Sequence, residues 1–296
     1  MRITSETMVM RSLDRLQGRL ATYERSQSEL ASGRRILQPS DDPSGSRRAM
    51  SLRSAMSARE QELRNVSDAT GWLHAADSQL QSALGRLSRA QELATRGASQ
   101  TGPSERHALA SEVRQIAEEV AGIANARHLD RPLFGGFGAG DAVARDGDGT
   151  WQALGGGEQV MRRVSDSEQV RVNVTAAEWM GFDADHDDLL TILDRLADRL
   201  ENGTSAEVSA SLGEVKTASS TVATSLADIG AATNRVESAR ARADDMLLTL
   251  RSELSDVEDV DLAKGVMDLQ VQQVAYEATL SAIGRALPPS LVAFLR

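Results

Sequence analysis

The sequence predicts a mainly α fold: an antiparallel rod of long helices, with a small β-rich insert domain at its tip and coiled-coil helices at both termini. Three observations lead to this prediction. Apolar residues recur at alternating steps of four and three near both ends, glycines and aromatic residues gather in one central segment, and helical periodicity fills the stretches on either side. The corresponding segments are an N-terminal assembly helix and link at 1–43, rod helices at 44–131, the insert at 132–182, rod helices at 183–257, and a C-terminal assembly helix and tail at 258–296.

Composition suits thin helical packing better than a bulky core. Only 3% of the 296 residues are aromatic, and most of the 41% that are hydrophobic are Ala, Leu and Val. The net charge of −10 argues against a general nucleic-acid binder. The absence of Cys excludes disulfides, thiolate metal sites and thiol nucleophiles. No run of about eighteen apolar residues predicts a membrane span, and the first residues do not read as a Sec-type signal peptide.

The first helix is expected from about Ser5 to Ala31. Ser32-Gly33 ends it, because glycine tolerates the left-handed conformation that follows a helix. An apolar seam with coiled-coil spacing runs along this helix. Its members are Val9, Leu13, Leu16, Leu20, Tyr23, Gln27 and Leu30.

The second helix follows an extended link over 34–40. Asp42 is the expected cap, and Pro43 fits the first helical position because its missing N–H has no partner there. Periodicity continues to about Gly97, which gives a helix of roughly 80 Å at 1.5 Å per residue and favours a rod. Its seam comprises Leu52, Met56, Leu63, Val66, Leu73, Leu80, Leu84, Leu87 and Ala94.

A third helix begins at about Gly102-Pro103 and ends before Pro132, and a different pattern then begins. From Phe134 to Phe182, glycine turns recur at short intervals, and residues 170–174 alternate with period two. This segment also holds three of the four Phe and two of the three Trp. We therefore expect a small β-rich insert with its own core.

Helical periodicity returns after the insert. A short amphipathic helix around residues 189–200 is closed by Asn202-Gly203, and Thr204 with Glu207 forms a capping box for the next long helix. That helix has its seam at Leu226, Ile229, Val236, Ala243, Leu247, Leu250, Leu254 and Val257. The last helix carries a second terminal seam, before Pro288-Pro289 and a short apolar tail. This seam comprises Leu262, Val266, Leu269, Gln273, Tyr276, Leu280, Ile283 and Leu287.

Charge is unevenly spread along the chain. Residues 1–65 hold twelve Arg against eight Asp and Glu, a balance of +4, whereas residues 253–261 hold five acids and no base. These opposite charges either help the two ends meet or form ordinary solvated surface.

No motif in the sequence predicts catalysis. The four His lie in different segments without ligand spacing, and the glycine run at 135–140 lacks the Lys-Ser/Thr of a phosphate loop. Residues 146–149, Asp-Gly-Asp-Gly, are expected to be a hairpin turn rather than a calcium loop. The acids at 183–188 are expected to favour the N-terminus of the helix that follows. We therefore expect no enzyme activity, cofactor or metal.

Several motifs resemble the flagellin superfamily. The opening Met1-Arg2-Ile3, the segment Leu30-Ala31-Ser32-Gly33-Arg34-Arg35-Ile36 and the Asp41-Asp42 pair resemble its N-terminal signature. Pro39-Ser40 before that pair and Pro43-Ser44-Gly45 after it are similar to the hook-associated branch, whereas flagellin itself usually continues Ala-Ala-Gly. Residues 273–278 and 289–295 resemble that branch's ending, and residues 133–136 and 162–174 resemble it more weakly. Flagellin's usual Gln-Ala-Asn-Gln stretch is absent.

The resemblance implies a structural protein of the bacterial flagellum, exported unfolded by the flagellar type III apparatus without a cleaved signal. It implies a ring of about eleven copies at the hook–filament junction, which templates flagellin assembly. The implied partners are other copies, a second junction protein on the hook side, flagellin on the filament side and an export chaperone, with neither nucleic acid nor membrane. The expected assembly interface comprises Leu13, Leu16, Leu20, Tyr23, Leu30, Arg34, Arg35, Leu269, Gln273, Tyr276, Leu280, Ile283, Leu291, Phe294 and Leu295.

Two alternatives remain open at this stage: a flagellin that forms the filament itself, and an unrelated rod-shaped interaction module or chaperone. In monomers of the family the terminal helices are typically disordered and become ordered on assembly. The residues agree, because a single seam of about 25 residues buries little apolar area without neighbours. Residues before about 40 and after about 260 are therefore expected to be protease-sensitive in the monomer.

Overall fold

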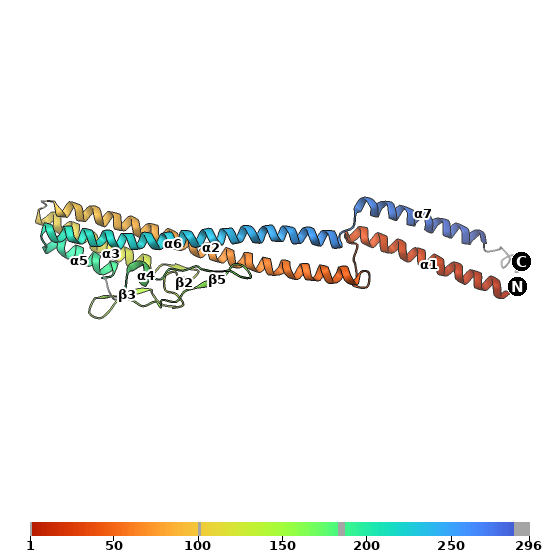
Figure 1. Ribbon diagram of the computed structural model, residues 1–296, viewed down its shortest axis with the longest axis horizontal. Coiled ribbons are helices and arrows are strands. Elements are labelled where there is room, and N and C mark those ends of the chain that lie inside the picture. Colours follow the sequence, from red (N-terminus) through yellow and green to blue (C-terminus); the bar gives the residue numbers. More distant parts are fainter. Residues whose placement is uncertain (1, 100–101, 183–186, 287–296) are drawn as a thin grey trace, which may run out of the picture. The chain divides into compact units, whose positions relative to one another are not determined.

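The computed structural model describes residues 2–99, 102–182 and 187–286, and it confirms the mainly α class with long helices and small β hairpins (Figure 1). The long helices follow the predicted segments to within a few residues. The helices are α1 (Arg2–Ser32), α2 (Pro43–Ala98), α3 (Pro103–Ala124), α4 (Ala176–Met180), α5 (Leu189–Asn202), α6 (Ser205–Glu258) and α7 (Leu262–Ala286). The strands are β1 (Arg127–His128), β2 (Arg131–Pro132), β3 (Val143–Arg145), β4 (Trp151–Ala153), β5 (Met161–Arg163) and β6 (Gln169–Arg171). None of the described helices has the length and apolar character that a membrane span requires.

The chain divides into two compact units. Residues 1–58 together with 247–296 form the terminal unit, and residues 59–246 form the central unit. The long helices α2 and α6 contribute residues to both units.

Alternating large and small residues build the core of the central unit. In α2, the leucines Leu73, Leu80 and Leu87 alternate with alanines at steps of three and four, and all are almost completely buried. Small residues between large ones allow helices to approach closely, so the low aromatic content does not prevent a dense core. The buried alanines of this stripe are Ala69, Ala76, Ala83, Ala90 and Ala94.

Helices α3 and α5 pack against each other and fold back from one end of the central unit. Near that end, the Arg106 guanidinium donates to the Leu200 carbonyl at 2.9 Å and to the Gly203 carbonyl. A Cβ on Gly97 would overlap Leu200 Cδ2, the end of a flexible side chain, so the end of α2 passes close to the end of α5.

The insert consists of three separate antiparallel hairpins, β1–β2, β3–β4 and β5–β6. Phe134 and Trp179 are fully buried with ring centroids 5.5 Å apart, but they belong to one continuous core with α2, α3, α5 and α6, so the predicted separate core of the insert is wrong. The predicted alternation over 170–174 is partly confirmed. Val170, Val172 and Val174 are buried, but strand β6 ends at Arg171 and Asn173 is buried as well.

Helix α4 was absent from the sequence prediction. The Glu178 carboxylate accepts a hydrogen bond from the Thr175 backbone N–H at 2.9 Å, and Gly181 ends the helix with φ +77°. The four-residue spacing Thr-Ala-Ala-Glu was the available sequence signal, because it is a capping box.

The position of the insert differs from the prediction. We expected it at the tip of the rod, but the end of the central unit is formed by the end of α2, the start of α3 and the turn between α5 and α6. The insert instead lies along the sides of α2 and α6 (Figure 1). The reason is that α3 and α5 lead the chain back from that end before and after the insert.

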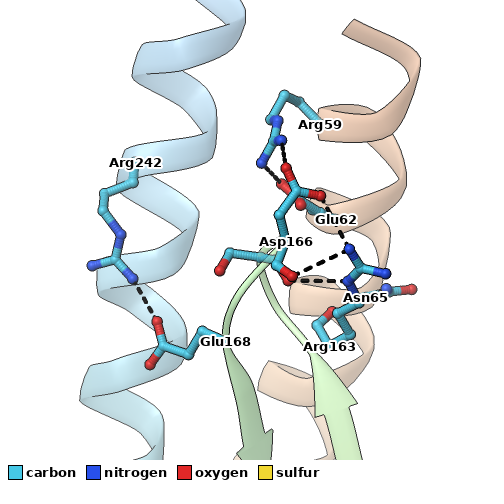
Figure 2. Close-up of polar contacts among 8 residues, drawn as sticks. Arg59, Glu62, Asn65, Arg163, Asp166, Glu168 and Arg242 are labelled. Carbon is cyan, nitrogen blue, oxygen red and sulfur yellow. Dashed lines mark hydrogen bonds and ion pairs between the residues drawn. The ribbon is translucent and has the colours of Figure 1, made fainter. Parts of the chain in front are cut away.

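The loop of the β5–β6 hairpin contacts both long helices (Figure 2). Asp166 pairs with Arg59 of α2 and, at 3.1 Å, with Arg163, while Glu168 pairs with Arg242 of α6 at 2.9 Å. We call these five side chains the hairpin clamp. The Arg59 hydrogen bond lowers the pKa of the Asp166 carboxyl.

Candidate assembly interface

Helices α1 and α7 of the terminal unit pack against each other in antiparallel orientation. Tyr23 and Tyr276 stack with ring centroids 6.5 Å apart and an interplanar angle of 16°. A Cβ on Gly265 would lie 3.0 Å from Leu30 Cδ2, so this contact is close. Towards the start of α1 a groove of about 830 Å³ separates the helices, between Gly18 and Ala282. The pair is therefore tight at the Tyr and Leu30 levels and more open beyond them.

This pair covers only part of each predicted seam. The half-buried members are Leu16, Tyr23 and Leu30 on α1, and Leu269, Tyr276 and Ile283 on α7. Other members face solvent: Leu13 is 48% exposed, Leu20 is 37% exposed and Leu280 is 46% exposed. Gln273 is also exposed, while the expected interface residues Leu291, Phe294 and Leu295 lie outside the described residues. The apolar surface of each helix is thus wider than one partner helix covers.

Helix α7 carries further exposed apolar residues away from α1. Val271 and Val274 are 64% and 65% exposed, and Met267 is 60% exposed. Outside its seam, α1 exposes Met10 at 65%, but most of its other exposed residues are polar or charged, such as Arg11 and Asp14. A helix with apolar residues on several faces is stable only when several neighbours cover it. Of the two helices, α7 therefore leaves more apolar surface for neighbouring helices to cover.

A short structured joint links each terminal helix to its long helix. Gly33, with φ +70°, ends α1, and its carbonyl accepts the Val260 N–H at 3.0 Å. The Arg35 N–H donates to the Glu258 carbonyl at 2.6 Å, and Arg34 forms an antiparallel bridge with Asp259. The sequence predicted an extended link here but not its pairing, because the two segments lie more than two hundred residues apart in the chain.

The two Arg of the joint differ in their side-chain contacts. Arg35 Nη2 donates to the Val257 carbonyl at 2.8 Å, and its Nη1 lies 3.6 Å from Asp42. The Arg34 side chain is exposed and has no partner within the part of the chain that the structure describes. Arg35 therefore supports the joint, whereas Arg34 is available to a neighbour.

The Asp-Asp pair orders the joint. Asp41 accepts the backbone N–H groups of Leu37 and Gln38, at 3.1 and 2.8 Å, and so closes the turn. Asp42 caps α2 as predicted, because its Oδ1 accepts the Gly45 N–H at 2.9 Å. That hydrogen bond is the main reason why the pKa of the Asp42 carboxyl is lowered.

Glycine at position 45 leaves room for the side chains of Asp42 and Ile36. A Cβ there would lie 2.5 Å from the Asp42 carboxylate and 2.6 Å from Ile36 Cδ1. The pattern Asp42-Pro43-Ser44-Gly45 is therefore one structural device: a cap, a first helical residue and a residue without a side chain.

The acidic segment 253–261 meets basic residues of the N-terminal region, as one of the two sequence interpretations proposed. Glu258 is only 5% exposed, and its Oε2 lies 2.6 Å from Arg53 Nη2. Arg48 lies 3.8 Å from Glu253, in a more exposed pair. Asp256 is exposed, so the alternative of solvated surface describes that residue. The sequence analysis did not single out Arg53, and only its charge could have suggested it.

The remaining candidate motifs have structural roles where they are described. Asp146 closes the β3–β4 turn by accepting the Thr150 N–H at 2.9 Å, as a hairpin turn requires. Asp188 caps α5 by accepting the Thr191 N–H at 3.0 Å, and Asp187 pairs with Arg195. The other members of the acidic cluster at 183–188, residues 183–186, lie outside the described residues. Within residues 2–99, 102–182 and 187–286, no three His, Asp or Glu side chains gather as a metal site would require.

Comparisons with known proteins match both ends of the chain. The model of the bacterial flagellin N-terminal helical region matches residues 3–130, and that of the bacterial flagellin C-terminal helical region matches residues 212–295. Flagellar hook-associated protein 3 of Escherichia coli (strain K12) is 22% identical over 306 residues, covering 95% of this chain and 96% of that protein. Flagellin of Bacillus subtilis (strain 168) is 22% identical over 320 residues, covering both chains completely.

Solved structures share the fold. A putative flagellar hook-associated protein from Vibrio parahaemolyticus has a TM-score of 0.69 and 21% identity, covering 74% of this chain and 100% of that one. Bacillus cereus FlgL has a TM-score of 0.60 and 19% identity, covering 69% of this chain and 99% of that one. At these identities the likeness concerns the fold alone.

Proposed function

The chain belongs to the bacterial flagellin family, and from this premise we propose that it forms the junction ring between hook and filament and templates flagellin assembly. A structural role in the flagellum follows from family membership and sets aside the unrelated interaction module. The junction position is our proposal, and it is supported by the nearly complete two-way coverage with the hook-associated relative.

One structural observation carries the assembly role: the paired helices α1 and α7 leave about half of their apolar seams exposed. An ordered joint connects these helices to α2 and α6. Exposed apolar surface of this kind is typical of protein interaction sites. We propose residues 1–43 and 258–296 as the assembly segments. Neighbouring copies cover Leu13, Leu20, Gln273 and Leu280, while Arg34 reaches across to a neighbour.

The ring closes with about eleven copies, contacts a second junction protein on the hook side and receives flagellin on the filament side. Before export, a chaperone covers the same apolar segments, which are the part of the chain that most needs protection from aggregation. We propose passage through the flagellar type III apparatus without a cleaved signal. We propose no enzymatic step and no partnership with nucleic acid or membrane.

A second candidate is flagellin itself, because flagellin relatives match with similar identity and coverage. A deletion strain viewed by electron microscopy separates the two functions. Hooks that lack filaments, with flagellin monomers in the medium, are expected for a junction protein. Antibody labelling of the complemented strain should mark a single band at the hook end, and labelling along the whole filament would favour flagellin. Normal filaments after deletion would contradict both candidates.

A further inference from the structure

The β1–β2 hairpin presents an exposed leucine in an unfavourable backbone conformation. Leu129 and Asp130 have φ values of +48° and +60°, in the left-handed region that leucine rarely adopts. The Leu129 side chain is also 77% exposed. The strain opposes folding, and the exposed side chain contributes almost no burial to offset it, so we looked for an external partner of this residue.

This turn is held by hydrogen bonds that connect it to a loop with a second exposed apolar residue. The Arg127 guanidinium donates to the Asp130 carbonyl at 2.6 Å and reaches the Ala139 carbonyl at 3.4 Å. It thereby ties the turn to the loop that carries Phe137, which is 62% exposed. We call Leu129 and Phe137 the apolar knob. The hairpin is anchored on α2, because the His128 ring packs edge-on against Trp72 at 5.6 Å.

A groove of about 720 Å³ lies where the insert meets α6. Among its lining residues Leu73, Val170 and Val172 are almost completely buried, so the accessible lining consists mainly of small and polar residues such as Thr224 and Ala231. The volume falls within the range of about 300–1,000 Å³ that accommodates small ligands. A groove of this size accommodates side chains of a protein partner, and the methyl groups of Thr224 and Ala231 supply its accessible apolar surface.

The knob and the groove also have complementary charges. Arg131, at the base of the knob, stacks on Trp72 and has no carboxylate partner among the residues with described side chains. Asp228, which lines the groove, is exposed and has no ion-pair partner in the same part of the structure. An ion pair between copies would use both groups and would fix the orientation of the contact.

We propose that the apolar knob of one copy inserts into the α6 groove of the next copy, as a lateral contact of the ring. This inference rests on the proposed function, which supplies the neighbouring copies. The knob is anchored on α2 and the groove lies against α6, so we expect the contact to join different surfaces of two chains. Contacts of that heterologous kind repeat around a ring.

Disulfide trapping tests the contact directly, because the chain contains no Cys. The full chain carrying Leu129→Cys and Thr224→Cys is expressed in the deletion strain, and hook–filament particles are isolated and oxidised. We expect a ladder of cross-linked multimers on a non-reducing gel. The control pair Asp148→Cys and Thr224→Cys places the first thiol on the β3–β4 turn and should give no ladder. Adding Phe137→Asp to the first pair should reduce the ladder on the order of tenfold.

The outcomes distinguish this inference from the function on which it rests. If the chain is present in the particles but the first pair gives no ladder, or the control pair gives an equal one, the contact is wrong and the ring proposal stands. If the chain is absent from the particles, the proposed function fails and this inference fails with it.

A second variant tests the strain: Leu129→Asn should raise the melting temperature of the purified chain, because Asn tolerates the left-handed region. A lower melting temperature would contradict the strain argument.

Discussion

At the scale of single residues, Glu258 and Arg53 fix the end of α6 to the start of α2 within the terminal unit. The Glu258 carboxylate is nearly buried, and Arg53 is its ion-pair partner at 2.6 Å. A buried charge that loses its partner is costly, because its desolvation is no longer offset. This pair therefore matters more than the exposed ion pairs around it.

Replacing Arg53 by Met keeps most of the aliphatic stem and removes the charge. We expect Arg53→Met to lower the free energy of unfolding by about 1–3 kcal/mol in urea titrations followed by circular dichroism. Arg48→Met, which removes only the exposed partner of Glu253, should change it by less than about 0.5 kcal/mol. Adding Glu258→Gln to Arg53→Met should recover most of the loss. Failure to recover it would show that packing of the Arg stem, rather than the charge pair, supplies the stability.

Arg34 is the residue of the joint whose side chain is free to act outside the chain. We expect Arg34→Glu to impair motility and junction assembly while leaving the circular dichroism spectrum and the melting temperature unchanged. Arg35→Glu should also lower stability, because Arg35 donates to the Val257 carbonyl. Arg64→Glu, on an exposed surface of α2 in the central unit, is the matched control. Swimming at the wild-type rate by the Arg34→Glu strain would rule out a role at an interface.

At the scale of elements, the hairpin clamp ties the β5–β6 loop to α2 and α6, and it responds to pH. Arg59 lowers the pKa of the Asp166 carboxyl in the folded protein. A carboxyl of this kind stabilises the folded state above its unfolded-state pKa of about 3.9, and the contribution is lost as the pH falls through the folded-state value.

The β5–β6 hairpin should therefore loosen under acid conditions before the helices unfold. We expect its amide hydrogen exchange, corrected for intrinsic rates, to rise as the pH is lowered below about 3.9. Asp166→Asn should give the faster exchange already at neutral pH and remove the acid dependence. Asp148→Asn, in the exposed β3–β4 turn, should change neither. An acid dependence that survives in Asp166→Asn would assign it to other carboxyls.

Substitutions on the exposed side of the α1–α7 pair should affect assembly, whereas substitutions between the two helices should affect folding as well. Leu13 and Leu20 are exposed, so the double change to Gln should alter the free energy of unfolding by less than about 0.5 kcal/mol. It should nevertheless abolish filament growth, because these residues face the neighbouring copies. Leu16→Gln, within the pair, should lower helicity as well.

The control for these changes is Met246→Gln, an equally apolar and exposed position in the central unit that is 48% exposed. Filaments should form normally in that strain. Filaments of normal length in the Leu13→Gln and Leu20→Gln strain would remove the seam from the assembly interface.

At the scale of the whole molecule, buried side chains are distributed very unevenly. No described side chain of α1 or α7 is buried, whereas the central unit has a continuous core that extends from α2 through the insert to α6. Local stability follows buried apolar contacts, so opening of the terminal helices requires less free energy than opening of the core.

Limited trypsin digestion of the monomer should therefore cleave first in α1, after exposed Arg11, Arg15 or Arg19. We expect a resistant fragment that begins near residue 40 and ends near residue 260, identified by mass spectrometry. In isolated hook–filament particles, the same bonds should be protected because neighbours cover them. Terminal helices that stay intact in the monomer while the insert is cut first would contradict this order.

The sequence by itself determined the long helices of this protein. Heptad spacing located the long helices, and the Asp42 cap and the Gly33 stop marked their ends, because these signals depend on neighbours a few residues away. The motif resemblance also pointed to the flagellin family. The periodicity did not predict helix α4, since a helix of five residues is too short to show a repeating pattern.

Only the tertiary structure decided which parts of the chain meet. It paired residues 33–35 with 257–260, buried Glu258 beside Arg53, and placed the insert along the sides of α2 and α6 rather than at a tip. It also divided each seam into a half-buried and an exposed set, which a one-dimensional period does not distinguish. The physical reason is the same in each case: local spacing sets which residues share a face, but the partner of that face depends on how distant segments pack.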